Sequence, residues 1–190
     1  MNKYTVGFAM TGSFCTFAKA IEVMEKLAQI GYDVVPIMSF NAFNLDTKFG
    51  KAADFKEKIK KICGREIINS IPDAEPIGPK KLVDVMLIAP CTGNTLAKLC
   101  RAITDTPVTM AAKSHLRIQR PVVIALATND ALGASAQNFG KALNTKNIYF
   151  VPMKQDDPTN KPTSLVANFD MIPETLDLAL EHKQIQQVFI

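Results

Sequence analysis

The stretch Val83–Thr95, VDVMLIAPCTGNT, gives the strongest structural signal in this 190-residue sequence. An apolar run suited to a strand buried on both faces leads into a proline, small polar residues, a glycine and an Asn-Thr pair. A helical pattern over residues 96–103 follows. Open parallel sheets present backbone N–H groups to an anion through such a strand, small-residue loop and helix. The stretch predicts either a ligand-binding loop or simply a strand, a turn and a capped helix.

The same alternation of strand, small-residue turn and helix recurs on both sides of this stretch. Short apolar runs predict strands at residues 4–10, 33–38, 121–128 and 148–153. Apolar stripes at helical spacing predict helices at residues 14–30, 52–63, 108–116, 135–143 and 173–182. Because the major strands are uniformly apolar and alternate with helices, we expect a three-layer α/β fold with a mostly parallel sheet.

Glycine and proline mark the ends of several of these elements. Gly31 and Gly64 stand where left-handed helix caps belong, and Pro107 suits the first position of a helix. Pro36 lacks a backbone donor, which favours an edge strand or a bulge. Residues 40–50 are expected to form a loop, and so is the proline-bearing connection before the central strand.

The length of the chain favours one domain covering residues 1–190. Within it, residues 154–190 are expected to form an appendage, a polar loop followed by a C-terminal helix.

Composition and charge exclude several classes of function. The net charge of +4 and the absence of tryptophan argue against a nucleic-acid-binding surface. Four scattered cysteines without a CxxC pair, together with two histidines, indicate no metal site. No apolar run is long enough to span a membrane and no signal peptide is evident, so we expect a reduced, cytoplasmic protein.

Small polar residues follow four of the predicted strands. These strand ends lie along one edge of a parallel sheet, so their loops can converge on a single crevice. Hydroxyls, an amide and helix N-termini suit a phosphorylated ring compound such as flavin mononucleotide (FMN). A single loop of this kind is more often a plain capped turn, and it is the coincidence of four that favours the ligand site. The residues are Thr11-Gly12-Ser13, Ser39, Thr92-Gly93-Asn94-Thr95 and Thr128-Asn129.

The sequence identifies no catalytic side chain, because it contains neither a GxSxG nor an HExxH motif. His115, among Lys113, Arg117 and Arg120, is interpreted as part of a solvated helix end in preference to a cationic patch for a dicarboxylate or a partner. Cys91 could be activated by a helix N-terminus, but a buried packing thiol is the simpler interpretation.

The motif APCTGNTLAKL, beginning at Ala89, resembles the flavoprotein family, as do Thr11-Gly12-Ser13 and Ser39. This family includes phosphopantothenoylcysteine decarboxylases, lantibiotic-processing decarboxylases and flavin prenyltransferases. The resemblance covers residues 4–153 and implies a flavodoxin-like (Rossmann-like) fold, trimer-based homo-oligomers and bound FMN. It places Gly12, Ser13 and Ser39 at the phosphate and ribityl end and Thr92, Gly93, Asn94 and Thr95 at the ring and ribityl chain, with Ala127, Thr128 and Asn129 closing the pocket.

Two departures from the family pattern weaken the expectation of a decarboxylase. No histidine lies between Ser39 and Val83, and the later PxMN motif is replaced by residues 125–130, ALATND. Residues 127–167 instead resemble a two-subunit oxidoreductase of the same family. That resemblance implies a separate nicotinamide-binding A subunit that supplies NAD(P), a small dicarboxylate substrate, and residues 161–164 near the crevice.

The resemblance leaves three functions open. The first is an oxidoreductase subunit that acts with the A subunit. The second is a self-sufficient FMN-dependent decarboxylase or flavin prenyltransferase, and the third is a non-catalytic scaffold.

Overall fold

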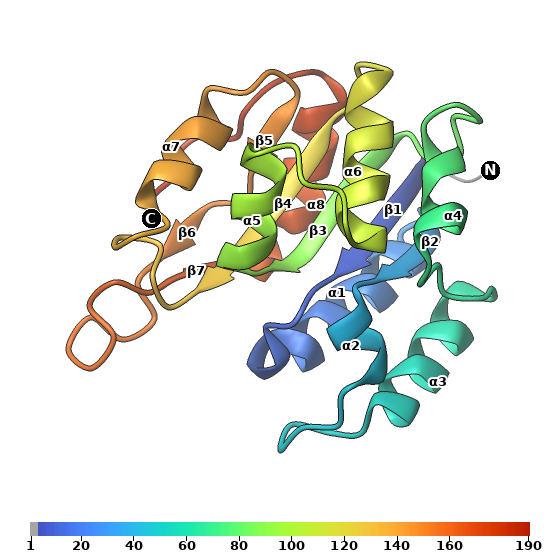
Figure 1. Cartoon of the computed structure of the whole chain (residues 1–190), viewed down its shortest axis with the longest axis horizontal. Coiled ribbons are helices and arrows are strands. Elements are labelled where there is room, and N and C mark those ends of the chain that lie inside the picture. Colours follow the sequence, from blue (N-terminus) through green and yellow to red (C-terminus); the bar gives the residue numbers. More distant parts are fainter. Residues whose placement is uncertain (1–3) are drawn as a thin grey trace.

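A seven-stranded sheet forms the centre of the computed structural model, which describes residues 4–190 (Figure 1). The strand order is β2-β1-β3-β4-β7-β6, and β5 also pairs with β4. Strands β1 to β5 pair in parallel, whereas β7 is antiparallel to β4 and β6. The strands are β1 (Thr5–Met10), β2 (Asp33–Met38), β3 (Val85–Cys91), β4 (Val122–Thr128), β5 (Ile148–Phe150), β6 (Met153–Lys154) and β7 (Leu165–Ala167).

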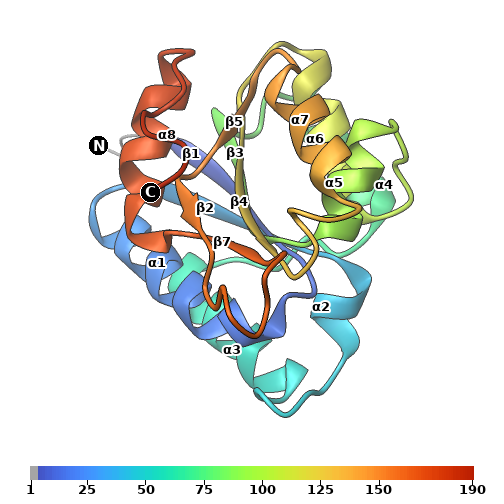
Figure 2. The same ribbon diagram turned by 90° about the vertical axis from the view of Figure 1, so that its left-hand side faces the viewer.

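Helices cover both faces of the sheet (Figure 2). One face carries α1 (Phe17–Gln29), α3 (Ala52–Cys63) and α8 (Ile172–Leu180). The other carries α4 (Ile71–Ala74), α5 (Gly93–Cys100), α6 (Pro107–Arg117) and α7 (Ala136–Leu143). The remaining short elements are α2 (Phe40–Asn44) and the 3-10 helices η1 (Phe14–Thr16), η2 (Glu75–Ile77) and η3 (Phe169–Met171). This arrangement confirms the predicted three-layer, flavodoxin-like fold.

The central strand shows why the sequence specifies three layers. Val85, Leu87 and Ala89 of β3 face the core under α1 and α8, while Met86 and Ile88 face the core under α5 and α6. All five side chains are fully buried. A strand between two helical layers has no solvent-facing side, so its apolar residues run on without polar alternation.

Glycine and proline occupy the positions predicted for them. Gly31 and Gly64 have φ of 98° and 63° just after α1 and α3. Pro107 is the first residue of α6, and Thr106 caps that helix. Pro36 lies in β2, which pairs with β1 at the edge of the sheet.

The structure corrects several predicted element boundaries. Helix α5 begins at Gly93, three residues before the predicted start, because the Thr92 hydroxyl accepts the backbone N–H of Thr95. The predicted loop over residues 40–50 begins with helix α2, which Ser39 caps. Residues 71–77 form α4 and η2. Residues 154–190 contribute strand β7 as well as α8, whose inner residues are buried in the core. No helix in residues 4–190 is long and apolar enough to cross a membrane.

His115 is not on a solvated helix end, so that interpretation was wrong. Its ring is fully buried, and the Pro121 backbone approaches it, although within residues 4–190 neither nitrogen forms a hydrogen bond of standard geometry. Burial, and secondarily the charge of Arg120, lowers the histidine pKa from 6.5 to about 4. The ring is therefore neutral in the folded protein at neutral pH.

We expect this buried ring to make stability fall in acid. His115 binds a proton more readily in the unfolded chain than in the folded protein. The contribution of this residue to the free energy of unfolding is therefore at its maximum above pH 6.5, and it decreases as the pH falls toward about 4. The free energy of unfolding should drop by up to about 3 kcal/mol from this group over that range. Urea titrations at several pH values, comparing the parent with His115→Gln, measure the effect. Replacement of the exposed His182 by Gln is the control, and equal pH slopes in parent and His115→Gln would contradict the expectation.

Candidate functional site

A crevice opens at the carboxyl ends of the parallel strands. The strand order reverses between β1 and β3, because the chain leaves β1 toward β2 and returns on the other side as β3. Loops diverge at such a switch point and leave a hollow between them. The crevice has two adjoining compartments, of about 400 and 610 Å³, which share Gly12, Phe14, Thr92 and Asn94 in their walls. These volumes are in the range of small-molecule sites.

All ten residues predicted to bind a cofactor line this crevice. Ser39 and Thr95 belong to the first compartment, whereas the second contains Ser13, Gly93, Ala127, Thr128 and Asn129. The shared wall supplies the other three, Gly12, Thr92 and Asn94. The structure thus confirms that turns separated by more than 100 residues meet on one rim, while their role in holding a cofactor stays a prediction.

Three helix N-termini point toward the first compartment. Ser39 Oγ accepts the N–H of Ala42 at 3.4 Å, at the start of α2. Thr92 Oγ1 accepts the N–H of Thr95 at 3.2 Å, at the start of α5, and Thr106 caps α6 with a reciprocal capping box. The partial positive charge of helix N-termini favours a bound anion. The charged residues in this compartment, Lys98 and Asp105, pair with each other at 2.8 Å.

Thr11 joins the two central strand ends beneath the crevice. Its hydroxyl donates to the Pro90 carbonyl at 2.8 Å and accepts the N–H of Thr92 at 3.0 Å. The side chain is almost fully buried, so both bonds are shielded from water. Thr11 was expected on the rim as part of Thr11-Gly12-Ser13, but the family resemblance assigned it no cofactor contact. Its position immediately after a buried strand indicated the rim, whereas its role in joining the two strand ends is visible only in the structure.

Gly93 allows the loop after β3 to pass close to the loop after β4. A methyl group on Gly93 would stand 2.7 Å from Thr128 Oγ1 and 3.0 Å from both Asp130 Oδ1 and Ser135 Oγ. Asp130 accepts hydrogen bonds from Thr128 at 2.6 Å and from Ser135 at 2.9 Å. The Thr128 bond is the larger cause of the lowered pKa of the Asp130 carboxyl. This cluster fixes the side wall of the second compartment.

Two polar segments, residues 45–50 and 155–164, each carry a lysine to the second compartment. Lys48 comes from the first segment and Lys161 from the second. The second segment is held to the rim by Thr163, whose hydroxyl donates to the Asn129 carbonyl at 2.6 Å and whose carbonyl accepts the Leu132 N–H. Residues 161–164 were expected near the crevice, whereas nothing in the sequence indicated Lys48.

No histidine is among the residues that line the crevice in the described part of the chain. His115 lies at the opposite end of the sheet, on the part of α6 that approaches Pro121, and His182 follows α8. Cys91 is fully buried and burial raises its thiol pKa, which agrees with a packing role. Cys15 is exposed and lines the second compartment. Within residues 4–190, no group of histidine, cysteine and acidic residues could hold a metal ion.

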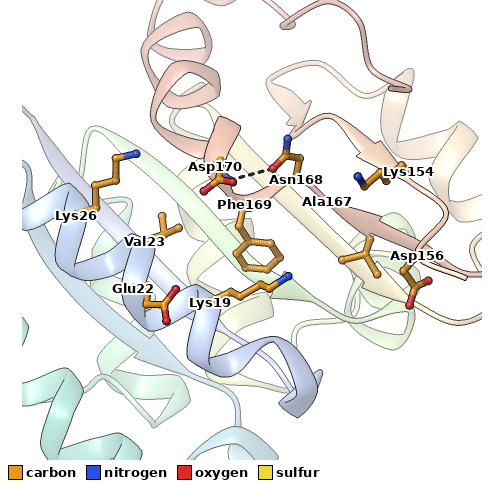
Figure 3. A pocket seen from close by; sticks show the side chains of 11 residues that line it. Lys19, Glu22, Val23, Lys26, Lys154, Asp156, Ala167, Asn168, Phe169 and Asp170 are labelled. Atoms are coloured by element: carbon orange, nitrogen blue, oxygen red, sulfur yellow. Dashed lines mark hydrogen bonds between the residues drawn. The ribbon is translucent and has the colours of Figure 1, made fainter.

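A separate hollow of about 610 Å³ lies between α1 and strands β6 and β7 (Figure 3). Lys19, Lys26 and Lys154 line it together with Glu22 and two aspartates. It shares no residue with the crevice, and its balanced charges favour no particular ligand. We therefore assign the candidate site to the strand ends.

Known proteins resemble this chain in both sequence and fold. A sequence model of the Flavoprotein family matches residues 1–169. The B subunit of dipicolinate synthase from Bacillus subtilis (strain 168) is 46% identical over 185 residues, which cover 97% of this chain and 92% of that protein. The crystal structure of the dipicolinate synthase B subunit from Bacillus halodurans C has a TM-score of 0.91 at 45% identity, covering 100% of this chain and 98% of the other.

The fold also resembles that of more distant proteins. The FMN-dependent cysteine decarboxylase SpaF has a TM-score of 0.68 at 20% identity, covering 95% of this chain and 97% of its own.

Proposed function

This chain belongs to the flavoprotein family, and from that premise we propose that it is the B subunit of a dipicolinate synthase. The observation that carries the proposal is the 46% identity to the B subunit of the Bacillus subtilis synthase over 97% of the chain. In this proposal the protein acts in the mother-cell cytoplasm during sporulation and forms trimer-based homo-oligomers. The exposed apolar side chains of Phe40 and Phe49, which line the crevice, and of Leu45 between them in the sequence support burial against another copy.

The proposed reaction is the oxidation of a dihydrodipicolinate to dipicolinate. The substrate loses two electrons and two protons, and the nicotinamide held by a separate A subunit is the final acceptor of the electron pair and one proton. A hydroxytetrahydro precursor would first lose water to give the same dihydro compound.

The residues of the crevice fit FMN as the cofactor. The first compartment offers hydroxyls, an amide and helix N-termini, which are the donors that a phosphate and a ribityl chain require. Gly12 leaves space at the shared wall, since a methyl group there would contact only the Phe14 ring, at 3.6 Å. We assign Gly12, Ser13 and Ser39 to the phosphate and ribityl end, residues 92–95 to the ring and ribityl chain, and residues 127–129 to the wall that closes the pocket. A bound flavin supplies two-electron redox chemistry, and these residues position it.

The chemistry of the crevice disfavours a self-sufficient decarboxylase or prenyltransferase. Within residues 4–190, no histidine or carboxylate lines the second compartment, so no general base of those types is available there. An active site completed by a partner subunit explains this better. The lack of such a base is equally consistent with a non-catalytic scaffold, and the experiment below separates a scaffold from a catalytic subunit.

We expect dipicolinate formation only when this chain is co-expressed with its A subunit. The assay measures pyridine-dicarboxylate production from the dihydro precursor with NAD(P), and it is repeated with Ser13→Ala and Asn94→Asp. Equal turnover by the A subunit alone would refute the proposal. Unchanged turnover in both variants, with the complex still formed, would assign the chain a scaffolding role. Turnover without the A subunit would support a self-sufficient enzyme.

A further inference from the structure

The second compartment, as the described residues form it, has two positively charged side chains in its wall and no negatively charged one. Its charged lining residues are Lys48 and Lys161. The nearby carboxylate of Asp130 is bonded to Thr128 and Ser135 and does not line the space. By contrast, the charges of the first compartment cancel within the pair of Lys98 and Asp105. The second compartment is therefore the cationic half of the crevice.

Lys48 is available to bind an anion. No carboxylate within residues 4–190 lies within ion-pairing distance of its ammonium group, which stands 5.3 Å from the centre of the Phe49 ring. The backbone around it is fixed by reciprocal hydrogen bonds between Thr47 and Gly50, of 3.0 and 3.1 Å. The turn therefore holds the Lys48 backbone beside the compartment, while its long side chain remains free to adjust.

Lys161 has a partner that an anionic ligand can replace. Its ammonium group lies 3.2 Å from Asp156 Oδ2, and both side chains are partly exposed to solvent. Such exposed pairs are weak because water screens both charges. The loop itself is well anchored, because Gln155 donates to the Pro162 carbonyl at 2.7 Å and Thr163 donates to Asn129. Lys161 can thus change partner without movement of the loop.

We propose that Lys48 and Lys161 bind the two carboxylates of a small aromatic or dihydropyridine dicarboxylate in the second compartment. This inference rests on the proposed function and names the residues that recognise its substrate. Two ammonium groups, carried to one compartment by two different loops, provide one cation for each carboxylate of the ligand. The Phe14 and Phe49 side chains in the same wall offer apolar contact to a flat ring. A flavin phosphate suits the first compartment better, where helix N-termini converge and the charges are balanced.

The test measures binding of pyridine-2,6-dicarboxylate to the whole chain, with and without added FMN. Calorimetry gives the dissociation constant, and the rate of Cys15 alkylation, resolved by mass spectrometry, reports occupancy because this exposed thiol lines the same compartment. We expect the ligand to slow Cys15 alkylation. Lys48→Met and Lys161→Met should each weaken binding about tenfold or more, because each removes one charge-assisted contact.

Matched variants separate charge from structure. Lys48→Arg and Lys161→Arg keep the charge and should retain most of the affinity. Lys146→Met removes an exposed lysine just before the amino end of β5. Because the crevice lies at the carboxyl ends of the strands, this variant should leave the affinity unchanged. Pyridine-2-carboxylate, with one carboxylate, should bind more weakly than the dicarboxylate.

The outcomes distinguish this site from the proposed function. Lysine-dependent dicarboxylate binding without synthase turnover supports the site and refutes the function. Turnover with the A subunit, combined with lysine-independent dicarboxylate binding, overturns the site. Loss of FMN affinity in the methionine variants, with unchanged dicarboxylate affinity, also overturns it and assigns the lysines to the flavin phosphate.

Discussion

Gly78→Ala is expected to destabilise the protein by about 3 kcal/mol or more. A methyl group at this position would stand 2.0 Å from the Ser114 carbonyl oxygen and 2.6 Å from its Oγ. The first of these is a backbone atom of α6 that cannot rotate away. The segment before β3 would have to separate from α6 and lose the hydrogen bond from the Gly78 N–H to Ser114 Oγ, now 2.9 Å. Urea denaturation measures the loss.

Gly140→Ala provides the matched control. Gly140 lies inside α7, and an added methyl group would meet nothing within 4 Å. Since alanine favours helix over glycine, this variant should gain about 0.5–1 kcal/mol. A Gly78→Ala protein as stable as the parent would show that the contact with α6 is looser than the structure indicates.

Gly12→Val is expected to lower FMN affinity about 100-fold while leaving the fold intact. Gly12 lines both compartments, and its added carbon would meet only the Phe14 ring, at the ordinary contact distance of 3.6 Å. The backbone there is not in the left-handed region that favours glycine, so the chain accepts a side chain. The valine would instead occupy space in the crevice. Quenching of flavin fluorescence on titration with the protein measures the affinity, and thermal unfolding measures the stability.

Gly93→Ala distinguishes crowding of the ligand from damage to the wall. Its methyl group would collide with the polar side chains around Asp130, so both stability and flavin affinity should fall. Gly12→Val should change affinity alone. Full flavin affinity in Gly12→Val would place the cofactor away from the shared wall of the crevice.

Much of the site could be predicted because its signals are local. The small residues after each strand are within a few positions of the apolar run that defines that strand, and parallel strands bring such ends to one edge. Helix α2 and the start of α5 were missed because their caps, Ser39 and Thr92, were assigned to a loop and to ligand binding. In the structure each of these side chains caps its helix and also lines the crevice, so the two roles do not exclude each other.

His115 shows where a local pattern fails. Its basic neighbours in sequence suggested a solvated surface. In the structure the His115 ring is buried, whereas Arg117, two residues later on the same helix, is exposed. On a helix, the direction of each side chain follows its angular position, and neighbours two residues apart face different sides. The orientation of α6 against the sheet therefore determines the environment of this histidine.

The sequence of this protein specified the three layers, the parallel strands and the polar turns at their ends, because hydrophobic periodicity and turn chemistry act over a few residues. The packed chain alone brought Lys48 and Lys161 to one compartment, closed Gly78 against Ser114 and buried His115. These juxtapositions depend on the order of the strands and on how helices cross the sheet. Both are set by the summed packing of residues far apart in the chain, so no single stretch of sequence encodes them.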